Sequence, residues 1–165
     1  MVEVIDNFLD SKYMEQIQHA LIHSYEFPWY YQNSVVYNEK GGNFQFTHMF
    51  YNKMVAQSRY YELLLPCIEQ LNVLSLIRIK SNLITRSSTH VEHGYHRDTL
   101  ETKTVHKTAV LYVNTNNGYT IFKDGRKVQS IANRLALFDS NIEHSGSTCT
   151  DENVRVVINF NYVEK

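Results

Sequence analysis

Apolar residues in the first part of the chain recur every three or four positions, which is the spacing of an amphipathic helix. One such segment, 10–24, is expected to begin with Asp10 or Ser11 as its N-cap residue. Its apolar face carries Met14, Ile17 and Leu21. A second segment, 58–72, has a broader apolar face, and Pro66 within it predicts a kink or a late helix start. The pattern therefore predicts two helices.

From Val73 onward the pattern changes to short β-branched or aromatic runs separated by Asn, Gly, Asp and Ser. The runs are 76–85, 106–114, 118–125, 126–132, 133–139 and 154–162. Asp124-Gly125 stands at the junction of two runs, and this pair suits the positive φ values of a hairpin turn. These runs predict an antiparallel β sandwich or barrel. The length of 165 residues predicts one domain, with a helical part at about 1–72 and a β core at about 73–163.

The last run, 154–162, has two different faces because successive side chains of a strand leave on opposite sides. One face is apolar throughout and carries Val154, Val156, Ile158, Phe160 and Tyr162. The other face is half polar and carries Arg155, Val157, Asn159 and Asn161. Two interpretations remain open at this point. The half-polar face is either exposed to water, or it directs Arg155 into the mouth of a barrel that binds an anion.

Composition narrows the classes of partner. The formal net charge is -1, and no block of like charges marks a nucleic-acid or membrane partner, so a small or neutral substrate is favoured. No apolar run approaches the roughly twenty residues of a membrane span. The N-terminal segment lacks the basic and apolar regions of a secretory signal, and Cys67 and Cys149 are far apart. We expect a soluble, cytoplasmic protein with free thiols.

Two His-x-acid pairs, His90/Glu92 and His96/Asp98, are candidate metal ligands because side chains two apart in an extended chain share a face. Roughly one such pair is expected by chance, so a third donor has to decide between them. His106 opens a strand and is expected to be exposed there. His144 follows an apolar strand and precedes a Gly/Ser turn, so we expect it to lie at the rim of the sheet.

The chain from about 76 to 162 resembles the Fe(II)- and 2-oxoglutarate-dependent oxygenases, particularly the small prolyl 4-hydroxylase-like members. The resemblance rests on the segments YHRD, TAVLYVN, NGYTIF, LALFDSNIEHSG and RVVINFNY, with a weaker similarity in VIDNFLD. It implies a mainly β fold with flanking helices: a double-stranded β-helix, which is a cupin-like jelly roll that holds iron at one open end.

The resemblance also implies a role for individual residues. His96, Asp98 and His144 match the 2-His-1-carboxylate triad, which leaves open positions on the iron for 2-oxoglutarate and O2. Arg155 matches the basic residue that binds the distal carboxylate of 2-oxoglutarate, and Tyr112 matches a tyrosine that contacts the same carboxylate in some members. No catalytic residue beyond the metal ligands is implied.

The implied activity is that of a dioxygenase, which oxidises 2-oxoglutarate to succinate and carbon dioxide and hydroxylates a substrate. The chain departs from the family pattern at Asn117-Gly118, where a Gly-Gly pair is more usual. Arg86 stands where many prolyl hydroxylases have a tyrosine, so the substrate is not specified. Arg86, Thr120 and Asn82 are candidate contacts for substrate or co-substrate. Asn82 shares its strand parity with Arg78 and Lys80, and an exposed strand face explains that parity equally well.

Other conspicuous residues receive structural interpretations. His90, Glu92 and His93 are expected to be solvated loop residues, and the aromatic run 27–32 is expected to pack in the core rather than line a pocket. Two other functions remain as alternatives to hydroxylation of a peptide, an amino acid or another small molecule. One is a nucleic-acid-acting oxygenase of the same fold, which would need a basic, aromatic groove. The other is a non-catalytic jelly-roll binding module. The sequence does not specify an oligomeric state.

Overall fold

The computed structural model describes residues 1–36, 43–98 and 106–165. The elements of the first 72 residues are β1 (Val2–Ile5), α1 (Ser11–Gln18), the π-helix η1 (His19–His23), β2 (Tyr30–Gln32), β3 (Gln45–Asn52), β4 (Val55–Ala56), the 3-10 helix η2 (Arg59–Leu64) and α2 (Leu65–Gln70). The later elements are β5 (Val73–Thr85), β6 (Lys107–Tyr112), β7 (Tyr119–Phe122), β8 (Lys127–Gln129), β9 (Arg134–Asp139), β10 (His144–Gly146) and β11 (Val154–Glu164).

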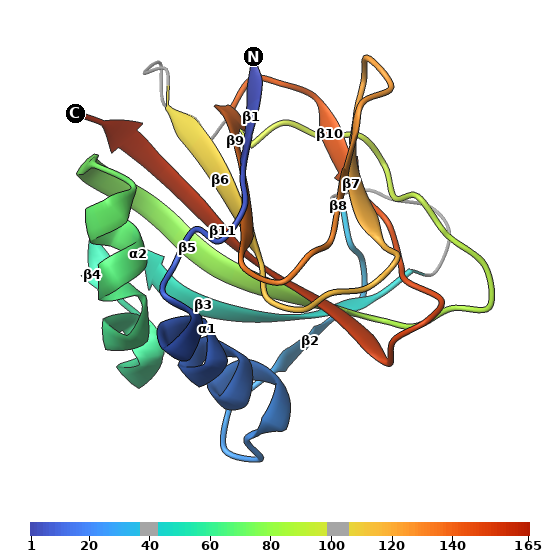
Figure 1. The fold of residues 1–165 in the computed structure, drawn as a ribbon, viewed down its shortest axis with the longest axis horizontal. Coiled ribbons are helices and arrows are strands. Elements are labelled where there is room, and N and C mark those ends of the chain that lie inside the picture. Colours follow the sequence, from blue (N-terminus) through green and yellow to red (C-terminus); the bar gives the residue numbers. More distant parts are fainter. Residues whose placement is uncertain (37–42, 99–105) are drawn as a thin grey trace.

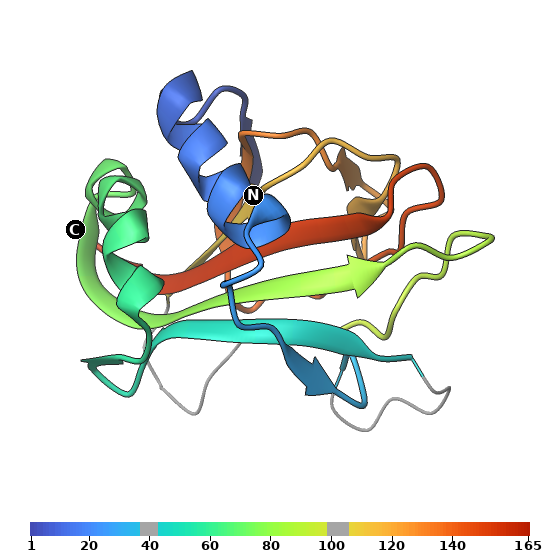
Figure 2. The same ribbon diagram turned by 90° about the horizontal axis from the view of Figure 1, so that it is seen from below.

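Two antiparallel sheets form the β core. Within the described residues, the larger sheet has the order β1-β9-β6-β11-β5-β3-β2, and the smaller has the order β10-β7-β8. In Figure 1 the helices α1 and α2 lie below and to the left of the long strands, whereas β7, β8 and β10 lie to their upper right. Figure 2 shows both helices against one side of β5 and β11. The larger sheet is therefore covered by helices on one face and by the smaller sheet on the other, as expected for a jelly roll.

The alternation along β11 separates two hydrophobic cores. Its apolar face packs with α1, η1 and α2 in the larger core, which includes Ile17, Leu21, Leu64, Cys67, Ile158 and Phe160. Its other face contributes to a smaller core between the sheets, which contains Val110, Tyr112, Phe122, Val128, Ala136, Phe138 and Val157. The predicted fold class, a mainly β jelly roll with flanking helices, is confirmed.

The predicted helices and hairpin are present. Asp10 caps α1, since its Oδ1 accepts a hydrogen bond of 3.0 Å from the backbone N–H of Lys12. Pro66 lies in the first turn of α2, so it marks a late start of that helix. The hairpin between β7 and β8 turns at Gly125, where φ is +87°. Gly125 alone in this turn has positive φ among the described residues; Asp124 does not.

The N-terminal part is less purely helical than the sequence pattern predicts. Residues 1–72 also contain β1, β2, β3 and β4, and β3 pairs directly with β5. The register between these two strands shifts at Met49/Tyr51, and this irregularity interrupts the period-two alternation by which a strand is recognised. β1 has four residues and pairs only with β9 among the described strands, so its pattern is also short.

Both cysteines have free thiols and are buried. Burial raises the pKa of Cys67 to about 12, so its thiol stays protonated. No helix in the described residues is long and apolar enough to cross a membrane.

Candidate metal and co-substrate site

Backbone pairing brings the two predicted histidine ligands together. His96 and His144 form an isolated antiparallel bridge, in which each backbone N–H donates to the other's carbonyl at 3.0 Å. Their side chains consequently leave on the same side, and the ring centroids are 4.5 Å apart. The backbone N–H of Asp98 donates to the carbonyl of Ser140 at 3.0 Å, which continues the contact between the two segments.

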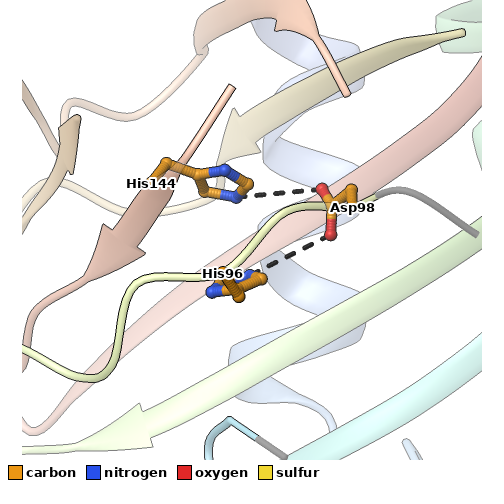
Figure 3. Close-up of side chains that lie close together, drawn as sticks. All are labelled: His96, Asp98 and His144. Atoms are coloured by element: carbon orange, nitrogen blue, oxygen red, sulfur yellow. Dashed lines mark ion pairs between the residues drawn. The ribbon is translucent and has the colours of Figure 1, made fainter. Parts of the chain in front are cut away.

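His96, Asp98 and His144 converge on one point (Figure 3). One ligand atom from each residue lies within 4.8 Å of the other two. The Nε2 of His144 is 3.8 Å from Asp98 Oδ2, and the Nε2 of His96 is 4.0 Å from Asp98 Oδ1. Ligand atoms about 2.1 Å from a metal and at right angles to each other lie about 3 Å apart, so the three side chains would move closer together on binding a metal. The donor set fits an octahedral divalent metal such as Fe(II).

Hydrogen bonds fix the imidazole tautomers. The Nδ1 of His144 is 3.0 Å from the carbonyl oxygen of Ile142, and the Nδ1 of His96 is 3.4 Å from that of Gly94. Because a carbonyl oxygen only accepts hydrogen bonds, each Nδ1 carries the proton. Each Nε2 therefore keeps its lone pair, and this is the arrangement that a metal-binding histidine requires.

Polar partners hold the carboxylate of Asp98 in place. Its side chain is 9% exposed, and its Oδ1 lies 3.3 Å from Arg78 Nη2. Its Oδ2 accepts hydrogen bonds from Thr108 Oγ1 at 3.1 Å and from Asn161 Nδ2 at 3.4 Å. Asn161 also accepts a hydrogen bond from Arg78 Nε at 3.0 Å. These contacts orient the carboxylate toward the histidines.

Charge and burial set the protonation of the triad. Burial alone would raise the pKa of Asp98, but interactions with His144, Arg78 and His96 outweigh it and hold that pKa below the usual range. Burial lowers the pKa of His96, which favours its neutral form. An ionised carboxylate and a neutral imidazole are the forms that bind metal.

Arg155 is a buried cation, 3% exposed. Its Nε donates to Ser130 Oγ at 2.8 Å and its Nη2 donates to Thr120 Oγ1 at 3.2 Å. No carboxylate in the described residues forms an ion pair with it. A Cβ at Gly118 would lie 2.7 Å from Arg155 Cδ, so the glycine of the Asn-Gly pair leaves room for this side chain. A buried guanidinium held only by hydroxyl groups is suited to bind an anion.

Tyr112 lies behind Thr120 rather than on the cavity wall. Its side chain is fully buried, and its hydroxyl donates to Thr120 Oγ1 at 2.8 Å. The Arg155 guanidinium carbon is 5.6 Å from the centre of the Tyr112 ring. Burial raises the pKa of Tyr112, so the hydroxyl remains a hydrogen-bond donor. The structure places this residue beside Arg155 as predicted, with Thr120 between its hydroxyl and the cavity.

One cavity of about 350 Å³ connects the metal-ligand candidates with Arg155. Thr120 and Asn82, both predicted as contacts, line it as well. Its lining also includes three cationic residues that the sequence analysis did not assign to the site, namely Arg78, Lys80 and Arg97. Two of them could have been found from the sequence, because Arg78 and Lys80 stand at alternate positions with the candidate Asn82 and so share its face of the strand.

The structure places Arg86 away from this cavity. It follows the end of β5, its side chain is exposed, and its backbone N–H donates to Asn153 O at 2.9 Å. It is not among the residues that line the cavity. The chain leaves the sheet at Thr85, so the inward-facing positions of β5 end before Arg86.

Two histidines are more buried than the sequence pattern predicts. His106 is 2% exposed, and its Nε2 lies 3.0 Å from the carbonyl oxygen of Asp98. His93 is 5% exposed, although we expected a solvated loop residue. His90 and Glu92 are exposed as expected, and Glu92 accepts a hydrogen bond of 2.7 Å from the Tyr119 hydroxyl. His106 contacts a residue eight positions earlier, before the strand begins, so the local pattern of the strand start did not reveal this contact.

The packing interpretation of the aromatic run 27–32 holds for only part of the run. Phe27 is buried in the larger core, and the Trp29 indole N–H donates to the Leu21 carbonyl at 3.1 Å. Tyr30 and Tyr31 are exposed. None of the six residues lines the cavity around the triad.

No protein-family model and no curated protein matches the sequence. Solved structures nevertheless match almost the whole chain. A Pseudomonas putida prolyl-4-hydroxylase is 14% identical with a TM-score of 0.67, over 99% of this chain and 92% of that one. A 2OG-Fe(II) oxygenase family oxidoreductase from Burkholderia pseudomallei is 10% identical with a TM-score of 0.70, over 98% and 85%.

A third structure, HygX from Streptomyces hygroscopicus, has nickel, 2-oxoglutarate and hygromycin B bound. It is 12% identical with a TM-score of 0.62, over 99% of this chain and 83% of that one. At these identities the likeness concerns the fold. The chain has the fold of the 2-oxoglutarate- and Fe(II)-dependent oxygenases.

Proposed function

We propose that this protein is an Fe(II)- and 2-oxoglutarate-dependent dioxygenase that hydroxylates a small molecule or a peptide. The observation that carries the proposal is the single cavity that contains both the histidine–carboxylate cluster and the buried Arg155. The cluster alone would fit many metal enzymes. The buried cation in the same cavity specifies a co-substrate that is anionic at the end distant from the metal.

In this proposal, His96, Asp98 and His144 hold the iron through two Nε2 atoms and one carboxylate oxygen. Three ligands on one face leave other positions open for the co-substrate and O2. Iron bound there would supply the oxidising chemistry for hydroxylation, in which one oxygen atom of O2 enters succinate as 2-oxoglutarate loses carbon dioxide and the other enters the substrate. Arg78, Thr108 and Asn161 keep the Asp98 carboxylate oriented, which is the role that outer partners of metal ligands commonly have.

Arg155 binds the distal carboxylate of 2-oxoglutarate. A guanidinium stays charged at any working pH and presents two parallel N–H groups to a carboxylate. Its Nε and Nη2 are already held by Ser130 and Thr120, so its orientation is fixed before the ligand arrives. Tyr112 positions Thr120 through the hydrogen bond between their hydroxyl groups.

The relatives in structure support a substrate outside the nucleic acids. The Pseudomonas putida protein is a prolyl-4-hydroxylase, and HygX has hygromycin B bound. Both proteins share this fold, and one fold can carry sites for different ligands.

The test is succinate formation from 2-oxoglutarate in the presence of Fe(II), measured with a panel of peptides, amino acids and oligonucleotides. We expect succinate that depends on iron and rises with a peptide, an amino acid or another small molecule. His144→Ala should abolish it, and His19→Ala should not, because His19 is an exposed residue of η1. Absence of iron-dependent succinate, together with absence of 2-oxoglutarate binding, would refute the proposal.

A further inference from the structure

The β5 strand presents a row of polar side chains to the cavity. Arg78, Lys80 and Asn82 occupy every second position of the strand, so they share one face, and all three line the cavity. Opposite them on β11, Asn159 pairs with Lys80, and Arg155 pairs with Ile84. Four residues of a strand span about 13 Å, so the backbone of Lys80 is well separated from the Arg155 position. Lys80 is therefore a second cationic group, at the other end of the strand pair.

Lys80 lies toward the metal-ligand end. Its neighbour in the row, Arg78, contacts Asp98 at 3.3 Å, and Lys80 lines the same cavity as His96 and Asp98. In the described part of the chain, the side-chain amine of Lys80 makes no hydrogen bond or ion pair, although the residue is partly buried. Burial and the charge of Arg78 lower the pKa of Lys80 to about 8, and the Asp98 carboxylate opposes this shift only in part. An anion beside this amine would compensate for both effects.

The charges that line the cavity do not balance. Among the described residues, its lining has four cations, Arg78, Lys80, Arg97 and Arg155, and one carboxylate, that of Asp98. Arg97 is paired with Glu143 at 3.6 Å, outside the lining. The remaining three cations and one carboxylate leave an excess of positive charge, in a protein whose formal net charge is -1.

The proposed cofactors do not remove this excess. Fe(II) brings two positive charges, and the 2-oxoglutarate dianion brings two negative charges, so their sum is zero. Arg155 and the metal would engage the two ends of that dianion. Both ends of the dianion would then be held without Lys80.

The side chain of Asn82 indicates a second property of the substrate, a hydrogen-bond donor. Its Oδ1 is buried and has no hydrogen-bond partner among the described residues. The 2-oxoglutarate dianion has no N–H or O–H group, so it cannot donate to this oxygen. A substrate with a donor near its anionic group would satisfy Asn82 and Lys80 together, because side chains two apart on a strand project from the same face.

We infer that the substrate of the proposed oxygenase carries an anionic group, a carboxylate or a phosphate, which binds Lys80 beside the metal-ligand cluster, and a neighbouring N–H or O–H that donates to Asn82. This inference rests on the proposed function. The cavity of about 350 Å³ is at the small end of ligand sites, so after 2-oxoglutarate is bound it admits a small acid or one acidic side chain.

The experiment compares matched pairs of probes that differ in one charge. Protein loaded with Fe(II) and 2-oxoglutarate under anaerobic conditions is titrated calorimetrically with N-acetyl amino acids and with the corresponding amides. A second pair, glycerol 3-phosphate and glycerol, distinguishes phosphate from carboxylate. We expect the acid of at least one pair to bind at least about tenfold more tightly than its neutral partner.

Lys80→Met tests the residue, because methionine keeps much of the side-chain length without the charge. It should remove the preference for the acid and leave the affinities for metal and for 2-oxoglutarate unchanged. Lys12→Met, an exposed position of α1, is the matched control and should keep the preference. The thermal midpoint of each variant shows whether it is folded.

Equal binding of acids and neutral partners, or no binding of any acid, would overturn the inference. So would weaker 2-oxoglutarate binding in Lys80→Met, because Lys80 would then belong to the co-substrate. These results differ from a failure of the proposed function, in which the parent protein would not bind 2-oxoglutarate at all.

Discussion

Arg155 is the residue whose environment most narrowly defines its ligand, because it is buried beside hydroxyl groups and forms no ion pair with a carboxylate of the described chain. A charge-assisted hydrogen bond contributes about 1.5–3 kcal/mol. We therefore expect Arg155→Ala to weaken 2-oxoglutarate binding about ten- to a hundredfold in a calorimetric titration. Metal binding should persist, since Arg155 makes no contact with the triad. Unchanged 2-oxoglutarate affinity would remove Arg155 from the site.

Asp98 supplies the negative charge of the metal site. Asp98→Asn keeps an oxygen that can accept from Thr108 and removes that charge, so we expect iron-dependent succinate formation to be lost while the metal-free protein stays folded. Asp124→Asn, on the exposed hairpin, is the control and should keep the activity. Full activity of Asp98→Asn would show that the carboxylate is not a metal ligand. Loss of folding in its far-ultraviolet circular dichroism would show that Asp98 is chiefly structural.

At the scale of elements, two neighbouring leucines that differ in burial test whether η2 packs against the sheet through one face. Leu64 is fully buried in the larger core, whereas Leu65 is 46% exposed. Leu64→Ala should lower the free energy of unfolding by about 2–5 kcal/mol, because it leaves a cavity between η2 and the sheet. Leu65→Ala should lower it much less. Urea unfolding measures both, and equal effects would contradict the assignment of this face to the core.

The elements that could be predicted from the sequence are those with a regular local pattern or a clear end signal. The alternation of β11 predicted its core face and left open whether the other face is exposed or lines a cavity. Asp10 and Pro66 indicated where the helices begin. β3 was missed because its register with β5 shifts at Met49/Tyr51. β10 has three residues, too few for a period to be recognised.

The candidate site could be predicted to a similar extent. The triad residues and Arg155 were assigned through the resemblance to the oxygenases, because spacing alone left two His-x-acid pairs and two interpretations of Arg155 open. The role of Arg78 beside Asp98 could not be predicted, because it depends on the distance between β5 and a segment 20 residues later. The burial of His106 likewise depends on a contact with the backbone of Asp98.

In the whole molecule, the two faces of the larger sheet differ in role: one packs in the main hydrophobic core, and the other lines the cavity. The helices cover one face of the larger sheet (Figure 1). Residues on its other face line the cavity. Ligands should therefore stabilise the native state through the cavity without altering the helical core. By mass action, metal at a hundred times its dissociation constant adds about 2.7 kcal/mol.

We expect Fe(II), added anaerobically, to raise the thermal midpoint of the parent protein. His144→Ala should lose this increase, because it removes one of the three ligands. His19→Ala, at an exposed position of η1, should keep it. An equal increase in parent and His144→Ala would show that iron binds elsewhere.

The central claim is that one cavity binds iron and 2-oxoglutarate together, and the most direct measurement is the affinity for 2-oxoglutarate with and without Fe(II), under anaerobic conditions. Two ligands that contact each other in one site strengthen each other's binding by the same factor. We predict that Fe(II) tightens 2-oxoglutarate binding by at least about tenfold in the parent protein, and that His144→Ala abolishes this effect. An affinity for 2-oxoglutarate that is the same with and without Fe(II) would contradict a shared site.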